Sequence, residues 1–523
     1  MNGFASGIAS AARRFRASPL GPVLGVFAAT AALAFADLAS SRVGVAAFGW
    51  LSVGGLVVSA AAWGALLSAP ALLVGRRARW LYAALALLWI PMTALQWHSR
   101  WRYHMPLDGS WVGIALCGSV SEVQWYLKNH LSALTVLVIV AVFAAAVAAF
   151  RWFRDRDYPR PSFACAVAAV AAVALFAARN CGDWSAPART FRRLAAVNFI
   201  ADTDEQLGDY RRLLAMCAHP RLPERVELAV PAEAAPVGVF VIGESATRNR
   251  WGLYGYARQT TPCLSAMKDR LCVFADATAT ASYTAAVMCD LLTHPGARGG
   301  SSAAYNLPQL LNAAGYDCEL VTSDARWGKG DGLETFLFHG CREMHFLAEK
   351  GLPEPWYDDA QLPYLEKALA DGDGRPLLVF LHLRGSHTPM DAQYPPGTGP
   401  FPGETIRRGV DRGDPQLCRN HYDNSIAFTD RLLGRVVELL EATGRPAWML
   451  YLSDHGESVE SRSWRDVTDR NLWEVPMVWW RSDAYAELAP EVARQMAASV
   501  RKPFRSDGIF DMIVRCALVN VGE

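Results

Sequence analysis

The chain has 523 residues, of which 52% are hydrophobic and only 19% charged, and its mean hydropathy is +0.11. Soluble globular chains usually carry about 25% charged residues, so this composition argues against a wholly cytosolic protein. The formal net charge of +1 hides an asymmetry, because residues 1–180 hold 15 Lys and Arg against 5 Asp and Glu, whereas residues 181–523 hold 36 against 45. No basic block with interleaved aromatic residues is present, so we expect no nucleic-acid partner.

Five apolar stretches in the first third of the chain are each long enough to cross a bilayer core of about 30 Å as a helix. They are Pro19–Leu38, Phe48–Leu73, Trp80–Trp97, Leu131–Phe150 and Ser162–Ala178. With the N-terminus inside, the inner segments carry 10 arginines and the outer segments 5 Lys and Arg, as the positive-inside rule requires. We therefore predict a five-helix transmembrane domain over residues 1–182. The rest of the chain then lies on the far side, which in a bacterial inner membrane is the periplasm.

Two further segments lie outside the predicted spans, one between two of them and one after the last. The outer loop His98–His130 contains Glu122, a candidate contact for a cationic lipid headgroup, with a solvated loop carboxylate as the alternative. Residues 183–236 are predicted to be a connector. Its Ala186–Ala218 stretch has helical propensity and a mixed charged face suited to the membrane surface, and several prolines then interrupt regular structure. We place a soluble domain at residues 237–523.

Short apolar runs in residues 237–523 have the length and β-branched content of buried parallel strands. They are Val237–Ile242, Asp317–Thr322, Pro376–Leu383 and Trp448–Leu452. Helical stretches such as Leu307–Ala314 and Asp423–Thr443 lie between them. This alternation predicts an α/β domain with a sheet between two layers of helices.

Polar residues follow three of these strands directly. Glu244 follows the first, His387 lies just beyond the third, and Asp454 and His455 follow the fourth. Ligands of such sheets bind beyond the carboxyl ends of the strands, and histidine with carboxylates suits zinc. Taken alone, each of these polar residues could have a purely structural role. Their common position beyond the strand ends predicts one metal site.

A hydroxyl nucleophile for that site is available at the start of a predicted helix. Thr284 lies where the helix N-terminus favours an anion, and a metal would lower the pKa of its hydroxyl. An ordinary N-cap is the structural alternative for such a threonine. Thr278, Thr280 and Ser282 lie close by and remain alternatives as nucleophile.

The motif from Val241 to Pro262, which reads VIGESATRNRWGLYGYARQTTP, resembles the opening motif of the phosphoethanolamine transferases. These are bacterial inner-membrane enzymes of the alkaline phosphatase/sulfatase superfamily. Further blocks match the family in order, and Val475–Trp480 looks like its closing strand. These blocks are Ser282–Thr284, Leu381–His387, Asn420–Ser425 and Ser453–Ser458.

The resemblance implies a mixed sheet between helices and a zinc ion bound by Glu244, Thr284, Asp454 and His455. Thr284 would be the nucleophile and His387 would contact the phosphoryl group or a second metal. It further implies phosphatidylethanolamine as donor and lipopolysaccharide, either lipid A or its inner core, as acceptor.

One departure from the family pattern concerns a second metal. Lipid A-modifying members commonly carry another histidine soon after the Asp-His-Gly-Glu block, whereas Ser461–Asn471 contains none. Asp466 or Asp469 is a candidate substitute, with a solvated loop as the alternative. Two rival functions stay open at this point: a phosphoglycerol transferase of the same superfamily, and a catalytically inactive membrane scaffold.

Overall fold

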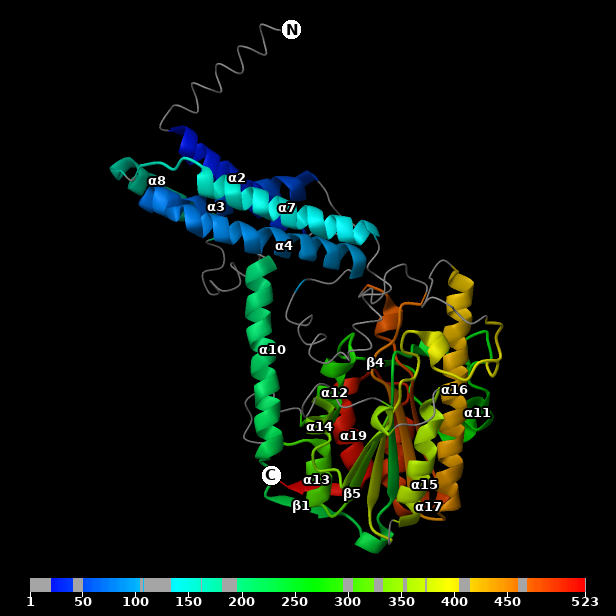
Figure 1. Cartoon of the computed structure of the whole chain (residues 1–523). Coiled ribbons are helices and arrows are strands. Elements are labelled where there is room, and N and C mark those ends of the chain that lie inside the picture. Colours follow the sequence, from blue (N-terminus) through cyan, green and yellow to red (C-terminus); the bar gives the residue numbers. More distant parts are fainter. Residues whose placement is uncertain are drawn as a thin grey trace. The chain divides into compact units, whose positions relative to one another are not determined.

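The computed structural model describes residues 20–40, 50–103, 107, 133–160, 162–180, 195–294, 304–323, 333–350, 355–371, 374–403, 414–459 and 468–522 (Figure 1). These residues form two compact units, one before residue 207 and one from residue 207 onward. Helix α10 (Ala195–Ala218) crosses the boundary between them.

Long apolar helices make up the first unit. They are α2 (Leu20–Ser40), α3 (Trp50–Val74), α4 (Arg79–Tyr103), α7 (Ala133–Asp155) and α8 (Phe163–Asn180). α2 packs on α3 and α4, α3 on α8, and α4 on α7. Small residues bring α2 and α3 into close contact: the Thr30 hydroxyl donates to the Gly64 carbonyl oxygen at 3.0 Å. Such small-residue packing is typical of helices that associate in a membrane.

Among the described residues, three stretches are long and apolar enough to cross a membrane by length and composition. They are Pro22–Ala39, Leu56–Arg100 and Val136–Asp155, and the second runs through both α3 and α4. The predicted apolar helices are therefore confirmed as helices, and the number of spans stays a prediction.

A seven-stranded mixed sheet, in the order β3–β9–β8–β2–β7–β5–β6, lies at the centre of the second unit. Strands β8, β2, β7, β5 and β6 run parallel, and at one edge β9 pairs antiparallel with β8 and β3 pairs antiparallel with β9. The strands are β2 (Val237–Gly243), β3 (Leu271–Val273), β5 (Asp317–Thr322), β6 (Glu343–Phe346), β7 (Leu377–His382), β8 (Ala447–Ser453) and β9 (Met477–Arg481). Two small sheets pair β1 (Arg225–Leu228) with β11 (Val519–Gly522) and β4 (Ala277–Thr278) with β10 (Phe504–Arg505).

The four predicted parallel strands are confirmed within one residue at each end as β2, β5, β7 and β8. All four are buried along their whole length or nearly so. A strand buried on both faces is a continuous apolar run in the sequence. The short edge strand β6 was not predicted, and its sequence EMHF is not a continuous apolar run.

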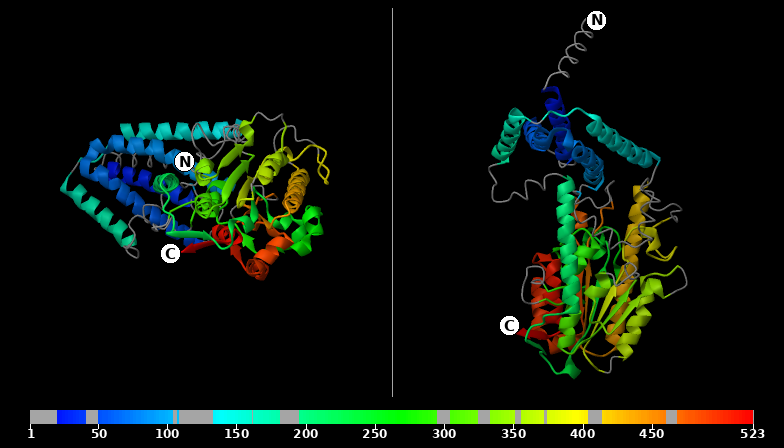
Figure 2. Two further views of the ribbon diagram at one scale, coloured as in Figure 1. Left: turned by 90° about the horizontal axis from the view of Figure 1, so that it is seen from below. Right: turned by 60° about the vertical axis from the view of Figure 1, so that its left-hand side comes forward.

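Helices cover both faces of the sheet, as Figure 1 shows and the two further views in Figure 2 confirm. Two separate apolar cores result, one on each face. The helices are α11 (Pro262–Ala266), α12 (Thr284–Leu292), α13 (Leu307–Ala313), α14 (Leu333–Leu337), α15 (Leu362–Asp371), α16 (Pro415–Ala442), α17 (Asp483–Leu488), α18 (Pro490–Ser499) and α19 (Ile509–Cys516). α16 begins eight residues before its predicted start, since Asp414 caps it by accepting from the backbone N–H groups of Gln416 and Leu417.

Candidate metal and nucleophile site

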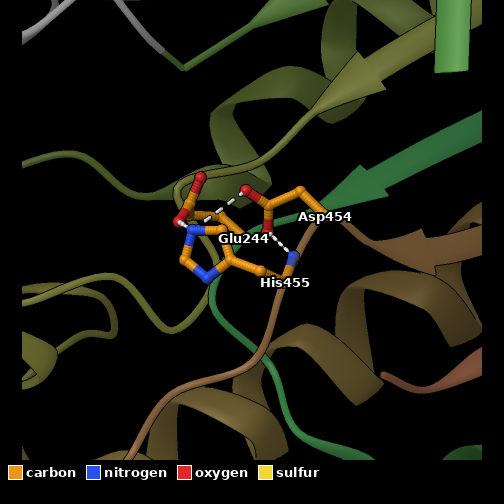
Figure 3. Close-up of side chains that lie close together, drawn as sticks. All are labelled: Glu244, Asp454 and His455. Carbon is orange, nitrogen blue, oxygen red and sulfur yellow. Dashed lines mark hydrogen bonds and ion pairs between the residues drawn. The ribbon is translucent and has the colours of Figure 1, made fainter. Parts of the chain in front are cut away.

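Two neighbouring strands bring the predicted metal ligands together. β2 and β8 are parallel and in register, with Gly243 opposite Ser453, so the residues that follow both strands emerge at the same edge of the sheet. The Asp454 backbone N–H donates to the Gly243 carbonyl oxygen at 3.0 Å and fixes this alignment. Glu244, Asp454 and His455 therefore meet at one point, as Figure 3 shows.

The ligand atoms of these three side chains all lie within 4.8 Å of one another. His455 Nε2 is 3.4 Å from Glu244 Oε1 and 3.3 Å from Asp454 Oδ2. All three residues are at least nine-tenths buried, and neither His455 Nε2 nor Asp454 Oδ2 has a hydrogen-bond partner. Buried polar atoms without partners are rare, and two carboxylates with one imidazole suit zinc, so the residues present fit a bound zinc ion.

The tautomer of His455 fits the same interpretation. Its Nδ1 lies 2.8 Å from the Gly456 carbonyl oxygen, which can only accept, so Nδ1 carries the proton. In the neutral ring the lone pair is then on Nε2, which faces Glu244 and Asp454. A backbone carbonyl that fixes the ring in this way is a usual outer partner of a metal-binding histidine.

The two carboxyl groups differ in their pKa. Burial acts to raise the pKa of Glu244, but the neighbouring His455 and His387, together with the hydrogen bond from Ser245, lower it below the ordinary value. Burial, and then the charge of Glu244, raise the pKa of Asp454 above its ordinary value. A positive charge between two buried carboxylates this close would allow both to stay ionised.

Thr284 contacts this cluster directly. It is the first residue of α12, and its hydroxyl donates to Glu244 Oε2 at 2.9 Å. Thr284 is half-buried. The Thr280 hydroxyl instead donates to Asp290 at 2.7 Å, and the Thr278 hydroxyl donates to the Phe504 carbonyl oxygen at 3.3 Å. Of these three threonines, the structure brings only Thr284 to Glu244.

The remaining predicted site residues differ in placement. His387 is half-buried and close enough to Glu244 to lower its pKa. Asp469 accepts from the Asn471 backbone N–H at 2.9 Å and so caps a short turn. Glu122 and Asp466 lie outside the described residues.

A second group with metal-binding residue types, Glu319, Glu343 and His345, lies on strands β5 and β6. Arg342 pairs with Glu319, and His345 Nε2 lies 3.1 Å from Glu343 Oε2. A guanidinium already neutralises the most buried carboxylate of the group, so these residues form an ion-pair network.

Sequence reasoning missed the residues that hold the candidate ligands in place. Asp358 accepts from the backbone N–H groups of Arg384 and Gly385, both at 2.9 Å. Gly385 packs against the Glu244 backbone with a φ of +51°. The only signal for Gly385 in the sequence is its place in the Leu381–His387 block.

Gly385→Ala is expected to weaken zinc binding by about tenfold or more, because a Cβ there would lie 2.7 Å from the Glu244 carbonyl oxygen and 2.9 Å from its nitrogen. Outer-shell changes typically cost 10–100-fold in metal affinity. Gly444→Ala is the matched control: its φ of +63° imposes the same left-handed strain, with no atom within 4 Å of the new Cβ. Zinc titration of both variants checks the result, and equal affinities would contradict it.

Comparison with known proteins identifies relatives of this chain. Residues 236–513 match the family model described as Sulfatase. The chain is 27% identical over 293 residues to the Kdo(2)-lipid A phosphoethanolamine 7''-transferase of Escherichia coli K12, a match that covers 53% of this chain and 51% of the relative. The chain therefore spans about half the length of this relative.

Solved structures share the fold. The integral membrane lipooligosaccharide phosphoethanolamine transferase A (EptA) from Neisseria meningitidis superposes with a TM-score of 0.67 at 18% identity and covers 95% of this chain and 96% of its own. The C-terminal periplasmic domain of EcEptC from Escherichia coli, in complex with Zn, has a TM-score of 0.51 at 22% identity and covers 58% and 87%. The full-length match agrees with an apolar helical part joined to an alkaline phosphatase/sulfatase-like domain.

Proposed function

The chain belongs to the sulfatase family, and from that membership we propose that it is a zinc-dependent phosphoethanolamine transferase of the bacterial inner membrane. It moves phosphoethanolamine from phosphatidylethanolamine to a lipopolysaccharide acceptor, either lipid A or the inner core. The observation that carries this proposal is the Thr284 hydroxyl bonded to Glu244, whose carboxylate converges with Asp454 and His455. The activity of the Escherichia coli relative, a lipid A phosphoethanolamine transferase, supports the transferred group and the acceptor class.

The reaction has two steps in this proposal. Thr284 Oγ1 loses its proton and attacks the phosphorus while the bond to the diacylglycerol oxygen breaks. The diacylglycerol oxygen takes up one proton as it leaves, which balances the proton that Thr284 loses. The hydrogen bond from the Thr284 hydroxyl to Glu244 Oε2, at 2.9 Å, orients Oγ1 in the site. An acceptor hydroxyl then loses its proton and attacks the phosphorus, and Thr284 Oγ1 leaves and takes up one proton in exchange.

The residues around Thr284 support this chemistry. Glu244, Thr284, Asp454 and His455 would hold a zinc ion, which when bound lowers the pKa of a hydroxyl and neutralises phosphoryl oxygens. The Thr284 position at the start of α12 places backbone N–H groups toward an incoming phosphate. His387 would contact the phosphoryl group or a second metal. Glu122 would contact the lipid headgroup.

We also propose the domain organisation that this function needs. Residues 1–182 would form a five-helix membrane domain, 183–236 a connector with an interfacial helix, and 237–523 a catalytic domain in the periplasm. The excess of arginine in the inner segments supports this orientation. A donor lipid and a lipid-linked acceptor both require a site near a membrane surface.

Intact-mass spectrometry of the full chain tests the proposal. After incubation in vesicles of phosphatidylethanolamine without acceptor, we expect a phosphoethanolamine adduct on Thr284 and release of diacylglycerol. Vesicles of phosphatidylglycerol are the matched control, and an adduct formed only from that lipid would favour the phosphoglycerol transferase. A zinc-loaded protein that gives neither adduct nor diacylglycerol from either lipid would contradict transferase activity and favour the inactive scaffold.

A further inference from the structure

Ser245 lies between two of the metal-site carboxylates and contacts both. Its hydroxyl donates to Glu244 Oε1 at 2.6 Å, and its backbone N–H donates to Asp454 Oδ1 at 3.0 Å. Ser245 is fully buried and has a φ of +57°, a left-handed conformation that residues other than glycine adopt at an energetic cost. The two contacts depend on this conformation, so the surrounding structure must hold it.

Tyr422 on α16 provides that support. Its hydroxyl donates to the Ser245 carbonyl oxygen at 2.7 Å and accepts from the Thr247 backbone N–H at 2.8 Å. One phenol oxygen therefore joins both ends of the turn that comes after Glu244. Tyr422 is fully buried in the apolar core on that face of the sheet, so water cannot replace its hydroxyl without repacking.

The helix that carries Tyr422 is itself held close to this turn. Asp423, the next residue, accepts from Arg258 at 2.8 Å and from Tyr256 at 2.9 Å. Arg258 also donates to Asn420 at 2.8 Å. These contacts fix the start of α16 against the segment just beyond the turn, so the Tyr422 hydroxyl meets residues 245–247 at a fixed position.

We propose that Tyr422 is a positioning residue, which acts through Ser245 to orient Glu244 and Asp454 toward the metal. This inference rests on the proposed function, because the zinc ion is the group for which the carboxylates are oriented. Without the Tyr422 hydroxyl, the Ser245 carbonyl and the Thr247 N–H are buried without partners. The turn then relaxes toward ordinary φ values, which moves the Ser245 hydroxyl away from Glu244 and its N–H away from Asp454.

Tyr422→Phe tests the proposal, with Tyr485→Phe as matched control. Tyr485 is also fully buried, and its hydroxyl donates to the Cys516 carbonyl oxygen at 2.8 Å, with no contact to the three ligands in the part of the chain that the structure describes. In chelator competition with zinc on the full chain, we expect a loss of affinity of about 10–100-fold for Tyr422→Phe and of less than about twofold for Tyr485→Phe. For diacylglycerol release at saturating zinc, we expect Tyr422→Phe to lower kcat and leave KM unchanged.

Ser245→Gly separates positioning from folding. Glycine accepts the left-handed φ without strain but lacks the hydroxyl that contacts Glu244, so we expect thermal stability at least equal to that of the wild type and zinc affinity about tenfold weaker. This variant decides the question if Tyr422→Phe does not fold. Wild-type zinc affinity in a folded Tyr422→Phe protein, or in Ser245→Gly, would overturn the positioning role alone. A wild-type chain that binds no zinc would overturn the proposed function and this role with it.

Discussion

Thr284→Ala is expected to lower the rate of diacylglycerol release from phosphatidylethanolamine by at least about 10³-fold, the order of loss seen when a covalent nucleophile is removed. In the wild type, the Thr284 hydroxyl contacts Glu244, whereas the Thr278 and Thr280 hydroxyls bond elsewhere. About one zinc ion per chain should remain, because Glu244, Asp454 and His455 are unchanged. Lipid extraction with quantification of diacylglycerol measures the rate, and elemental analysis measures the zinc.

Thr280→Ala is the matched control for this prediction. It removes a hydroxyl four residues away that donates to Asp290 and not to Glu244, so we expect activity within a few-fold of wild type. Thr284→Ser keeps an oxygen at the same position and should retain measurable turnover. If Thr284→Ala turned over at the wild-type rate while Thr280→Ala did not, the nucleophile would have to be reassigned.

The sequence was informative about the position of the proposed metal ligands, because these residues come directly after buried parallel strands. Glu244 and the Asp454-His455 pair each come after an uninterrupted apolar run, and parallel strands place their carboxyl ends at one edge. Only the pairing of β2 with β8 was needed to bring them together. Thr284 was harder to identify, because four Ser and Thr residues lie within seven positions and only the tertiary contact with Glu244 distinguishes Thr284 from Thr280.

The residues that support the ligands could not be predicted in the same way. Tyr422 is far from Ser245 in the sequence, and an apolar core position is the ordinary expectation for a tyrosine on a helix. Its role depends on one phenol oxygen reaching two backbone groups, a relation that no local pattern encodes. The left-handed conformation of Ser245 likewise could not be predicted from the sequence, since serine rarely adopts it.

Asp454→Asn is expected to weaken zinc binding by at least about 100-fold, because loss of a direct ligand should exceed the 10–100-fold typical of outer-shell residues. The fold should survive. Asp454 Oδ1 accepts from the backbone N–H groups of Ser245 and His455, and an asparagine carbonyl oxygen can accept both. Only Oδ2, the oxygen that faces His455, is replaced by an amide nitrogen.

The stability of the metal-free protein tests more sharply whether the Asp454 carboxylate serves the metal or the fold. Burial and the charge of Glu244 raise the pKa of Asp454, so without a cation its charge is unfavourable, and Asp454→Asn should leave the metal-free chain at least as stable as wild type. Asp430→Asn is the matched control: this buried carboxylate accepts from the Cys263 and Leu264 N–H groups with its two different oxygens. Asparagine can keep only one of these bonds, so Asp430→Asn should lose about 1–3 kcal/mol of stability yet bind zinc normally. Thermal unfolding with and without zinc distinguishes a carboxylate that binds the metal from one that stabilises the fold. If the metal-free Asp454→Asn protein unfolds as readily as Asp430→Asn, Asp454 is a residue that stabilises the fold.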